Sequence, residues 1–211
     1  MLPPEIFTSI FLMAYQRSIS CNNDYEYYDE LNRMPPARTI AETSAYWRQI
    51  AISTPSLWTD IRINTGKPWY NNAISSLSHA NGAPVHVTVF EAHVEDTDMR
   101  WSWERLRKPL AFFDACRQIQ ALRIYSSGYS KDTIDIVLKH WLDYCSPGVT
   151  TVLRIQRPEA VLSLDTPPPL DWDFDLESIE HAESVLASIS VLQIECIFIP
   201  WEIRKYSEFK S

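Results

Sequence analysis

The stretch IQALRIY, residues 119–125, and the stretch VTTVLRIQ, residues 149–156, share the triplet Leu-Arg-Ile at a separation of 31 residues. A related triplet, Leu-Gln-Ile, follows 39 residues later within VLQIECIFI, residues 191–199. Short runs rich in Val, Ile and Leu that are bounded by turn residues are typical of β-strands. We therefore predict strands at these three places, and a further strand at PVHVTVF, residues 84–90.

Helical patterns lie between the predicted strands. The first is DTIDIVLKHWLDYC, residues 132–145, with Asp132 as its N-cap. Its apolar face consists of Ile134, Val137, Leu138, Trp141 and Leu142. The second is SIEHAESVLASI, residues 178–189, in which the aligned apolar residues are Ile179, Ala182, Val185 and Leu186. Strand–helix units that recur every 30–40 residues predict an α/β (α+β) solenoid of irregular, leucine-rich-repeat type. A small doubly wound α/β domain is the alternative.

The composition limits what these segments can build. The chain has 211 residues, of which 45% are hydrophobic, so it is long enough for a sizeable core or for two units that share an interface. Its 4 glycines are too few for the tight hairpin turns of an all-β meander. A net charge of −8 argues against binding to nucleic acid or to an anionic membrane, because both need a basic surface.

The four cysteines are scattered along the chain, with no close pair. They are Cys21, Cys116, Cys145 and Cys196. This spacing predicts neither a disulfide framework nor a metal site. The opening residues also lack the basic lead-in of a secretory signal. We therefore expect reduced thiols and a location in the cytoplasm, the nucleus or both.

No sequence motif indicates catalysis, so we expect no enzyme activity, cofactor or metal. The chain lacks a phosphate-binding glycine loop, a Gly-x-Ser-x-Gly elbow and a His-Glu-x-x-His pair. His79, His86 and His93 are spaced by seven, but Gly82-Ala83-Pro84 interrupts any helix that would join them. The acidic block at residues 164–177 predicts an exposed loop without the spacing of an EF-hand.

The amino-terminal stretch MLPPEIFTSIFLMAYQ, residues 1–16, predicts a helix that begins at Pro4. From Ile6 to Ala14 only Thr8 and Ser9 are polar, so this helix is more apolar than one buried face requires. The apolar run is roughly half the length of a membrane span, which needs about 20 residues. We expect the second apolar side to be covered by another chain; an ordinary core helix is the alternative.

The next segments predict a small helical unit that contains two tryptophans. Residues 16–37 are polar, acidic and tyrosine-rich, and we interpret them as a surface insertion. A helix is predicted over residues 38–52, RTIAETSAYWRQIAI. STPSLWTDI follows, in which Thr54 can cap a short helical turn that starts at Pro55. Trp47 on the helix and Leu57 and Trp58 on the turn can then close a three-helix core.

Two segments, in this order, resemble the F-box, particularly the F-box-like form of large fungal families. They are LPPEIFTSIF, residues 2–11, and YWRQIAISTPSLW, residues 46–58. LQIECIFIPW, residues 192–201, is similar to the leucine-rich segments that follow the F-box in such proteins. The sequence departs from the family pattern at the 16–37 insertion, and at Thr43-Ser44, where Val-Cys is usual.

The resemblance implies a three-helix F-box-like unit at residues 1–63 and a repeat region at residues 64–211, which could be truncated. F-box domains bind a Skp-type adaptor, which joins them to a cullin-based (SCF-type) ubiquitin ligase. The resemblance assigns adaptor binding to Leu2, Pro3, Ile6, Ile10, Phe11, Trp47, Leu57 and Trp58. The repeat region would bind an unknown target protein. The alternatives are an interaction scaffold unconnected with ubiquitin and a degenerate family member.

Overall fold

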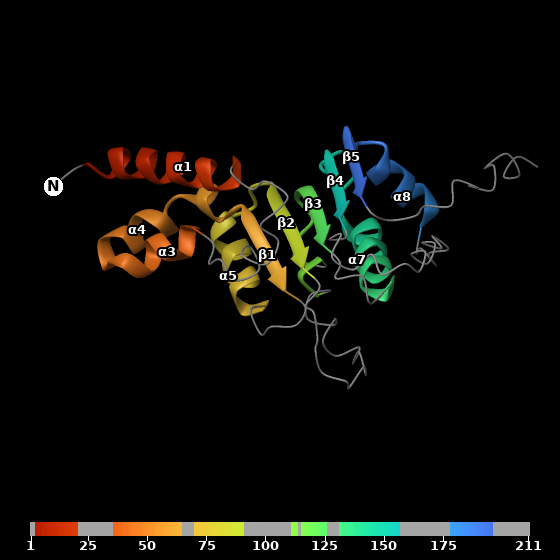
Figure 1. The fold of residues 1–211 in the computed structure, drawn as a ribbon, viewed down its shortest axis with the longest axis horizontal. Coiled ribbons are helices and arrows are strands. Elements are labelled where there is room, and N and C mark those ends of the chain that lie inside the picture. Colours follow the sequence, from red (N-terminus) through yellow and green to blue (C-terminus); the bar gives the residue numbers. More distant parts are fainter. Residues whose placement is uncertain are drawn as a thin grey trace, which may run out of the picture.

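The computed structural model describes residues 3–20, 36–64, 70–90, 111–113, 115–125, 131–156 and 178–195. Its elements, in chain order, are α1 (Pro4–Ser20), α3 (Pro36–Thr43), α4 (Ala45–Ile52), the 3₁₀-helix η1 (Pro55–Trp58), β1 (Asp60–Asn64), α5 (Tyr70–Ala80), β2 (Val85–Phe90), β3 (Ile119–Tyr125), α7 (Lys131–Tyr144), β4 (Val152–Gln156), α8 (Ile179–Leu186) and β5 (Val191–Glu195). Figure 1 shows α1, α3 and α4 at one end of the molecule, next to β1 and α5.

The strands form one parallel sheet of five strands in the order β1-β2-β3-β4-β5. This finding confirms the predicted α/β class and the four strands predicted from the sequence. A doubly wound sheet contains a point at which the strand order reverses, and the described sheet contains no such reversal. The order therefore favours the solenoid over the doubly wound alternative, while the leucine-rich-repeat assignment stays a prediction.

The three triplets that were aligned in the sequence lie side by side in the sheet. Their equivalent positions are paired across β3, β4 and β5: Leu122, Leu153 and Leu192 in one row, and Ile124, Ile155 and Ile194 in another. The members of these rows on β3 and β4 are fully buried. Because side chains alternate between the two faces of a strand, the leucine and isoleucine of each triplet face one side and the central residue faces the other.

Two elements at the start of the sheet were not predicted. β1 (Asp60–Asn64) has the sequence DIRIN, which is short and alternates charged or polar residues with two isoleucines. It becomes a strand because Ile61 and Ile63 are buried and because it pairs with β2 over its whole length. α5 (Tyr70–Ala80) follows and ends where Asn81 and Gly82 have positive φ values of 50° and 77°. Glycine adopts that conformation without strain.

The single helix predicted over residues 38–52 is two helices, α3 and α4. Ser44 has an extended backbone between them, and its Oγ accepts a hydrogen bond from the backbone N–H of Trp47 at 3.1 Å. This is the geometry of an N-cap, in which a serine oxygen satisfies one of the free amides of the first helical turn. The chain therefore changes direction at Ser44, and α4 starts a new axis.

Three boundary predictions need correction as well. The insertion predicted at residues 16–37 is shorter, because residues 16–20 belong to α1 and residues 36–37 to α3; residues 21–35 lie outside the described part. Thr54 does not cap η1, since its hydroxyl donates to the carbonyl of Ile50 at 2.8 Å. Asp132 is not the N-cap of α7, because the helix already includes Lys131.

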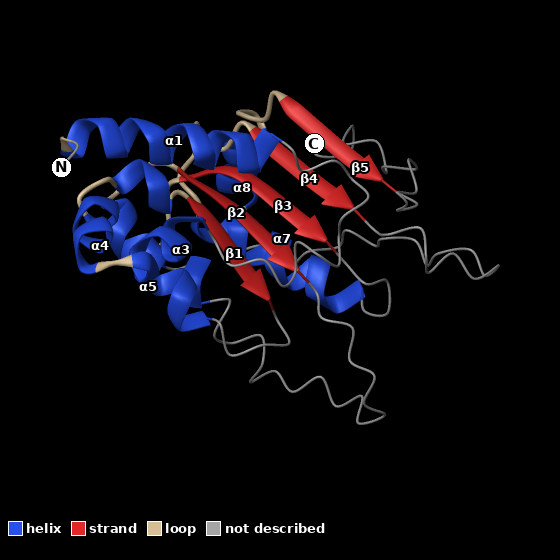
Figure 2. Ribbon diagram, turned by 60° about the vertical axis from the view of Figure 1, so that its left-hand side comes forward, coloured by secondary structure: helices blue, strands red, loops and turns tan. Residues whose placement is uncertain are grey.

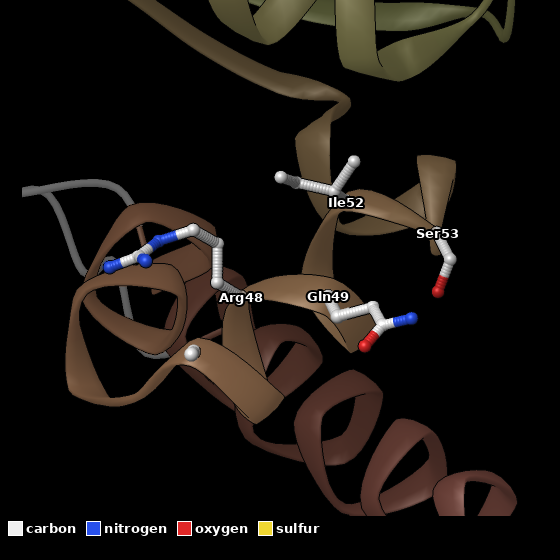
Figure 3. Close-up of a pocket in the computed structure, with 5 residues that line it drawn as sticks. Arg48, Gln49, Ile52 and Ser53 are labelled. Carbon is white, nitrogen blue, oxygen red and sulfur yellow. The ribbon is translucent and has the colours of Figure 1, made fainter.

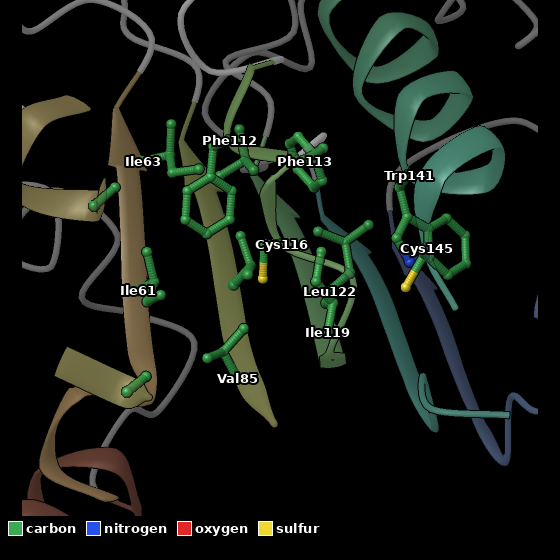
Figure 4. Packing of buried hydrophobic residues seen from close by; sticks show 14 of the residues in the cluster. Ile61, Ile63, Val85, Phe112, Phe113, Cys116, Ile119, Leu122, Trp141 and Cys145 are labelled. Carbon is green, nitrogen blue, oxygen red and sulfur yellow. The ribbon is translucent and has the colours of Figure 1, made fainter. Parts of the chain in front are cut away.

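The main core lies between the sheet and the helices that follow its strands. In Figure 2 the strands lie in front of α7 and α8. All five apolar residues predicted for the face of α7 are buried, as are Ala182 and Val185 of α8. Ile179 and Leu186 of α8 were predicted to join them but are exposed. Figure 4 shows Phe112, Phe113 and Cys116 over the strands, with Trp141 and Cys145 together at α7.

A buried polar cluster joins α7 to the strands around Thr150, just before β4. The Thr150 hydroxyl donates to the carbonyl of Ile119 at 2.6 Å and accepts from the indole N–H of Trp141 at 3.3 Å. Its Oγ1 also lies 3.4 Å from the sulfur of Cys145. Since buried polar groups need partners, one hydroxyl satisfies an indole and a carbonyl group that would otherwise be buried without them.

Candidate functional site

The inner face of α1 is held by aromatic side chains. Phe7 lies with its ring centroid 5.8 Å from that of Tyr46 in an edge-to-face arrangement, and 5.9 Å from that of Trp47. Phe11, which is buried, lies 5.0 Å from Trp47, also edge to face. Aromatic pairs of this geometry are favourable beyond their buried area. This side of α1 therefore packs on α4, and α1 also contacts α3 and η1.

The opposite side of α1 carries an exposed apolar strip. The exposed fractions are 47% for Ile6, 43% for Ile10 and 62% for Met13. These three residues, spaced by four and three, lie on one face of the helix, and we call them the outer strip of α1. Met13 was not among the predicted site residues. The described residues leave this strip exposed, and its coverage by another chain stays a prediction.

The remaining predicted site residues fall into two groups. Pro3 is exposed and Trp47 is partly buried, whereas Leu2 lies outside the described residues. Leu57 and Trp58, like Phe11, are buried within this chain. The indole N–H of Trp58 donates to the carbonyl of Ala51 at 2.7 Å, which ties η1 to the end of α4. These buried side chains hold the helical unit together, so we narrow the proposed contact surface to Pro3 and the outer strip.

A second accessible surface lies on α4 and was not predicted. An open hollow of about 420 Å³ is lined by Ala45, Arg48, Gln49, Ile52 and Ser53, all from α4 and its carboxyl-terminal end. Figure 3 shows Arg48, Gln49 and Ile52 projecting from this helix. Ile52 is 44% exposed. The signal available in the sequence was the spacing of these positions by three and four, which places them on one helical face.

Tyr15 joins α1 to the first strand of the sheet. Its hydroxyl lies 3.3 Å from the Thr59 hydroxyl. Burial, reinforced by the negative charge of Asp60, raises the pKa of Tyr15 from 10.0 to about 12. Asp60 itself is paired with Arg62 at 3.2 Å. The junction thus holds a neutral phenol beside a compensated carboxylate, an arrangement that supports packing rather than proton transfer at neutral pH.

The described residues contain no constellation that points to catalysis. No group of three or more His, Cys, Asp or Glu side chains among them is placed to hold a metal ion. His79 packs against Trp58 with ring centroids 4.6 Å apart, while a ring nitrogen of His86 lies 3.3 Å from Gln120 Oε1. His93 and the acidic block at residues 164–177 lie outside the described residues.

Two of the four cysteines fall within the described residues. Cys116 and Cys145 are both free and buried. Burial raises the pKa of the Cys116 thiol from 9.0 to about 12. A thiol reacts as its thiolate, so Cys116 is inert at neutral pH.

No protein-family model, no curated protein and no solved structure matches the chain. Within the described residues, no helix combines the length and the apolar character needed to cross a membrane.

Proposed function

We propose that this chain is a non-catalytic substrate-receptor subunit of a cullin-based ubiquitin ligase. Residues 1–63 bind a Skp-type adaptor, and residues 64–211 bind a target protein. The observation that carries the proposal is the outer strip of α1, which stays exposed while Phe7 and Phe11 on the inner face of the same helix pack against α4. The F-box-like order of the two amino-terminal segments supports the choice of adaptor.

The size of the exposed strip sets the affinity that it can supply. Fully burying a side chain such as Ile or Met contributes about 1.5–3 kcal/mol. Because Ile6, Ile10 and Met13 are each roughly half covered already, their burial in a complex adds about 2–5 kcal/mol in total. Part of this gain is offset by lost rigid-body freedom. A stable complex therefore needs further contacts, and Pro3 is one candidate because it is also exposed.

Co-expression with a Skp-type adaptor tests the proposal. The chain should co-purify with the adaptor as a stable complex, and the double substitution Ile6→Asp with Ile10→Asp should abolish it. The matched control is Ile179→Asp, because Ile179 is 57% exposed but belongs to α8. The control should bind like the unmodified chain. Undiminished binding of the double variant would reject the assignment.

The scaffold alternative predicts a different result for the same variants. If α1 only caps the repeat region, aspartate on the outer strip should lower the melting temperature without removing a particular partner. Thermal unfolding of the purified variants therefore accompanies the binding assay. Phe11→Asp is unsuitable here, because Phe11 is buried and its substitution disrupts packing under both hypotheses.

A further inference from the structure

The last helix and the last strand of the described chain leave apolar side chains exposed at one end of the sheet. The exposed fractions are 57% for Leu192 of β5, 57% for Ile179 of α8 and 41% for Leu186 of α8. By contrast Leu153, which pairs in register with Leu192 on β4, is buried. We call Leu192, Ile179 and Leu186 the end surface. Figure 1 shows α8 and β5 at the opposite end of the molecule from α1, so the end surface is separate from the outer strip.

The two apolar residues of α8 in the end surface face away from α7. The buried residues of α8 are Ala182 and Val185. On one flank of this buried face lies His181, whose Nε2 is 3.0 Å from the carbonyl oxygen of Cys145, directly after α7. Ile179 and Leu186 lie on the other flank, because residues three, four and seven apart share one side of a helix. They therefore point towards the open end of the sheet.

The outer edge of β5 offers backbone groups for hydrogen bonding. The N–H of Val191 donates to the carbonyl of Thr151 at 3.0 Å, so the backbone groups of Val191 face β4. Because these groups point in alternate directions along a strand, those of Leu192 and Ile194 point away from β4. No strand in the described part of the chain pairs with β5 on that side. The edge thus presents donors and acceptors at two positions.

β5 also lacks the features that usually keep an edge strand from pairing. Natural edge strands carry Lys or Pro, or contain a β-bulge that twists the edge away. The sequence of β5 is VLQIE, with neither Lys nor Pro. Its pairing with β4 runs over five residues without a register shift. An edge of this kind is suited to accept another strand.

The charged residues at this end of the sheet select the partner. Residues 178–195 contain no Lys or Arg, whereas Glu180 and Glu183 of α8 are exposed. Glu183 is four residues from Ile179 and three from Leu186, so it lies on the same side of α8 as the end surface. A second copy of this chain on a two-fold axis would place the same acidic surface against itself, and like charges repel. Basic residues in the partner are therefore favoured.

We propose that the end surface binds an extended segment of another protein, in which aliphatic residues alternate with Lys or Arg. The segment adds to the described sheet as a strand beside β5, and its backbone forms hydrogen bonds with Leu192 and Ile194. Because side chains alternate between the two faces of a strand, its aliphatic residues cover the end surface. Its Lys or Arg residues complement the negative charge of Glu180 and Glu183.

This inference goes beyond the proposed function and does not depend on it. The end surface and the outer strip belong to different elements, so the test uses the full chain without an adaptor. Failure of the adaptor experiment leaves this result unaffected, and failure of the present test leaves adaptor binding unaffected.

The probe is a fluorescein-labelled peptide, Lys-Val-Lys-Ile-Arg-Val-Lys, whose binding to the full chain is measured by fluorescence polarisation at physiological ionic strength. In one matched peptide Glu replaces every basic residue. In a second, Pro replaces the central Ile and removes a backbone N–H. The basic peptide should bind at least tenfold more tightly than either. Equal binding of the three peptides, or no binding of any, overturns the proposal.

Substitutions to aspartate separate strand addition from attraction by charge alone. Leu192→Asp should weaken binding of the basic peptide more than tenfold, although it adds a negative charge to the chain. Ile52→Asp is the matched control, because Ile52 is 44% exposed but belongs to α4, and it should change binding less than twofold. Equal or tighter binding of the Leu192→Asp variant would show that the peptide is held by charge alone, and the proposal would be wrong.

Two further variants test the α8 side of the surface. Leu186→Asp should also weaken binding more than tenfold, and the melting temperature of both leucine variants should stay close to that of the unmodified chain, because both side chains are exposed. Glu180→Gln combined with Glu183→Gln should weaken binding about two- to fivefold, as expected for exposed ion pairs. Unchanged binding of the glutamine variant would refute the role given to the acidic residues.

Amide hydrogen exchange of the unmodified chain tests the edge directly and identifies other occupants. The amides of Leu192 and Ile194 should exchange rapidly in the free chain and become protected when the peptide is saturating. Protection of both amides in a free monomer would mean that the residues after β5 already occupy the edge. Protection accompanied by a dimer in sedimentation would mean that a second copy does. Either result overturns the proposal.

Discussion

Replacing Thr150 with valine removes one hydroxyl group from the buried cluster between α7 and the sheet, while the shape of the side chain hardly changes. The indole N–H of Trp141 then loses its acceptor at 3.3 Å, and the carbonyl of Ile119 loses a donor at 2.6 Å. Both Trp141 and Ile119 are fully buried in the core between α7 and the sheet. The substitution is therefore a direct measure of what this hydroxyl contributes to folding.

Each buried polar group that is left without a partner costs about 1–3 kcal/mol. Two such groups give a loss of about 2–6 kcal/mol in the free energy of unfolding. For a domain of this size, 1 kcal/mol corresponds to a shift of about 2–4 °C in melting temperature, so the expected decrease is about 4–24 °C.

Equilibrium unfolding in urea measures this loss, with circular dichroism and tryptophan fluorescence as independent probes. Thr151→Val is the matched control, because its hydroxyl is partly exposed and lies 3.5 Å from the carbonyl of Gln120. The control should lose less than about 1 kcal/mol. If Thr150→Val is no more destabilising than the control, the cluster does not contribute as described and the reasoning is refuted.

Three further predictions concern other sites. The folded chain holds the Tyr15 proton more tightly than the unfolded chain, since the pKa is raised to about 12 from 10.0. The raised pKa therefore contributes about 2–3 kcal/mol to the free energy of unfolding, and this contribution is present below pH 10 and is lost between pH 10 and 12. Urea unfolding at pH 9 and at pH 11.5 should show most of this decrease, and the Tyr15→Phe variant should lack it. Iodoacetamide at pH 8 should leave Cys116 unmodified until urea is added, as measured by mass spectrometry, because burial raises the pKa of its thiol to about 12; rapid labelling of the folded chain would contradict the burial. Ser44→Ala removes the N-cap of α4 and should lower the free energy of unfolding by about 1 kcal/mol, with Ser44→Asn restoring it.

Strands and helices could be predicted from the sequence where the residues of a single segment carry the pattern of that element. β2 to β5 are short runs rich in Val, Ile and Leu, and the five apolar residues of α7 follow helical spacing. Both kinds of element were therefore predicted, and the burial of the five α7 residues is confirmed. β1 was missed because DIRIN carries Asp60 and Arg62 on its outer face, and only its pairing with β2 identifies it as a strand. The break at Ser44 was missed because serine is also tolerated within helices, and the capping hydrogen bond is visible only in the structure.

The candidate site was predicted only in part, because the sequence carries local signals but does not show which residues pack together. An excess of apolar residues on α1 is evident from composition, yet the sequence could not tell which of them face inward. Packing against Tyr46 and Trp47 decides this, because it buries Phe11 and leaves Ile10 exposed. Neighbours across the sheet could not be identified from the sequence alone, since residues such as Arg123 and Arg154 are paired only through the strand register.

The sequential strand order has a consequence for how the molecule opens. Each strand of the described sheet pairs only with the strands next to it in the chain, so the sheet is stabilised by contacts between sequential neighbours. β5 is an edge strand of the described sheet, and Leu192 in this strand is 57% exposed. Fraying should begin there and proceed towards β3, so the slowest-exchanging backbone amides belong to the middle of the sheet.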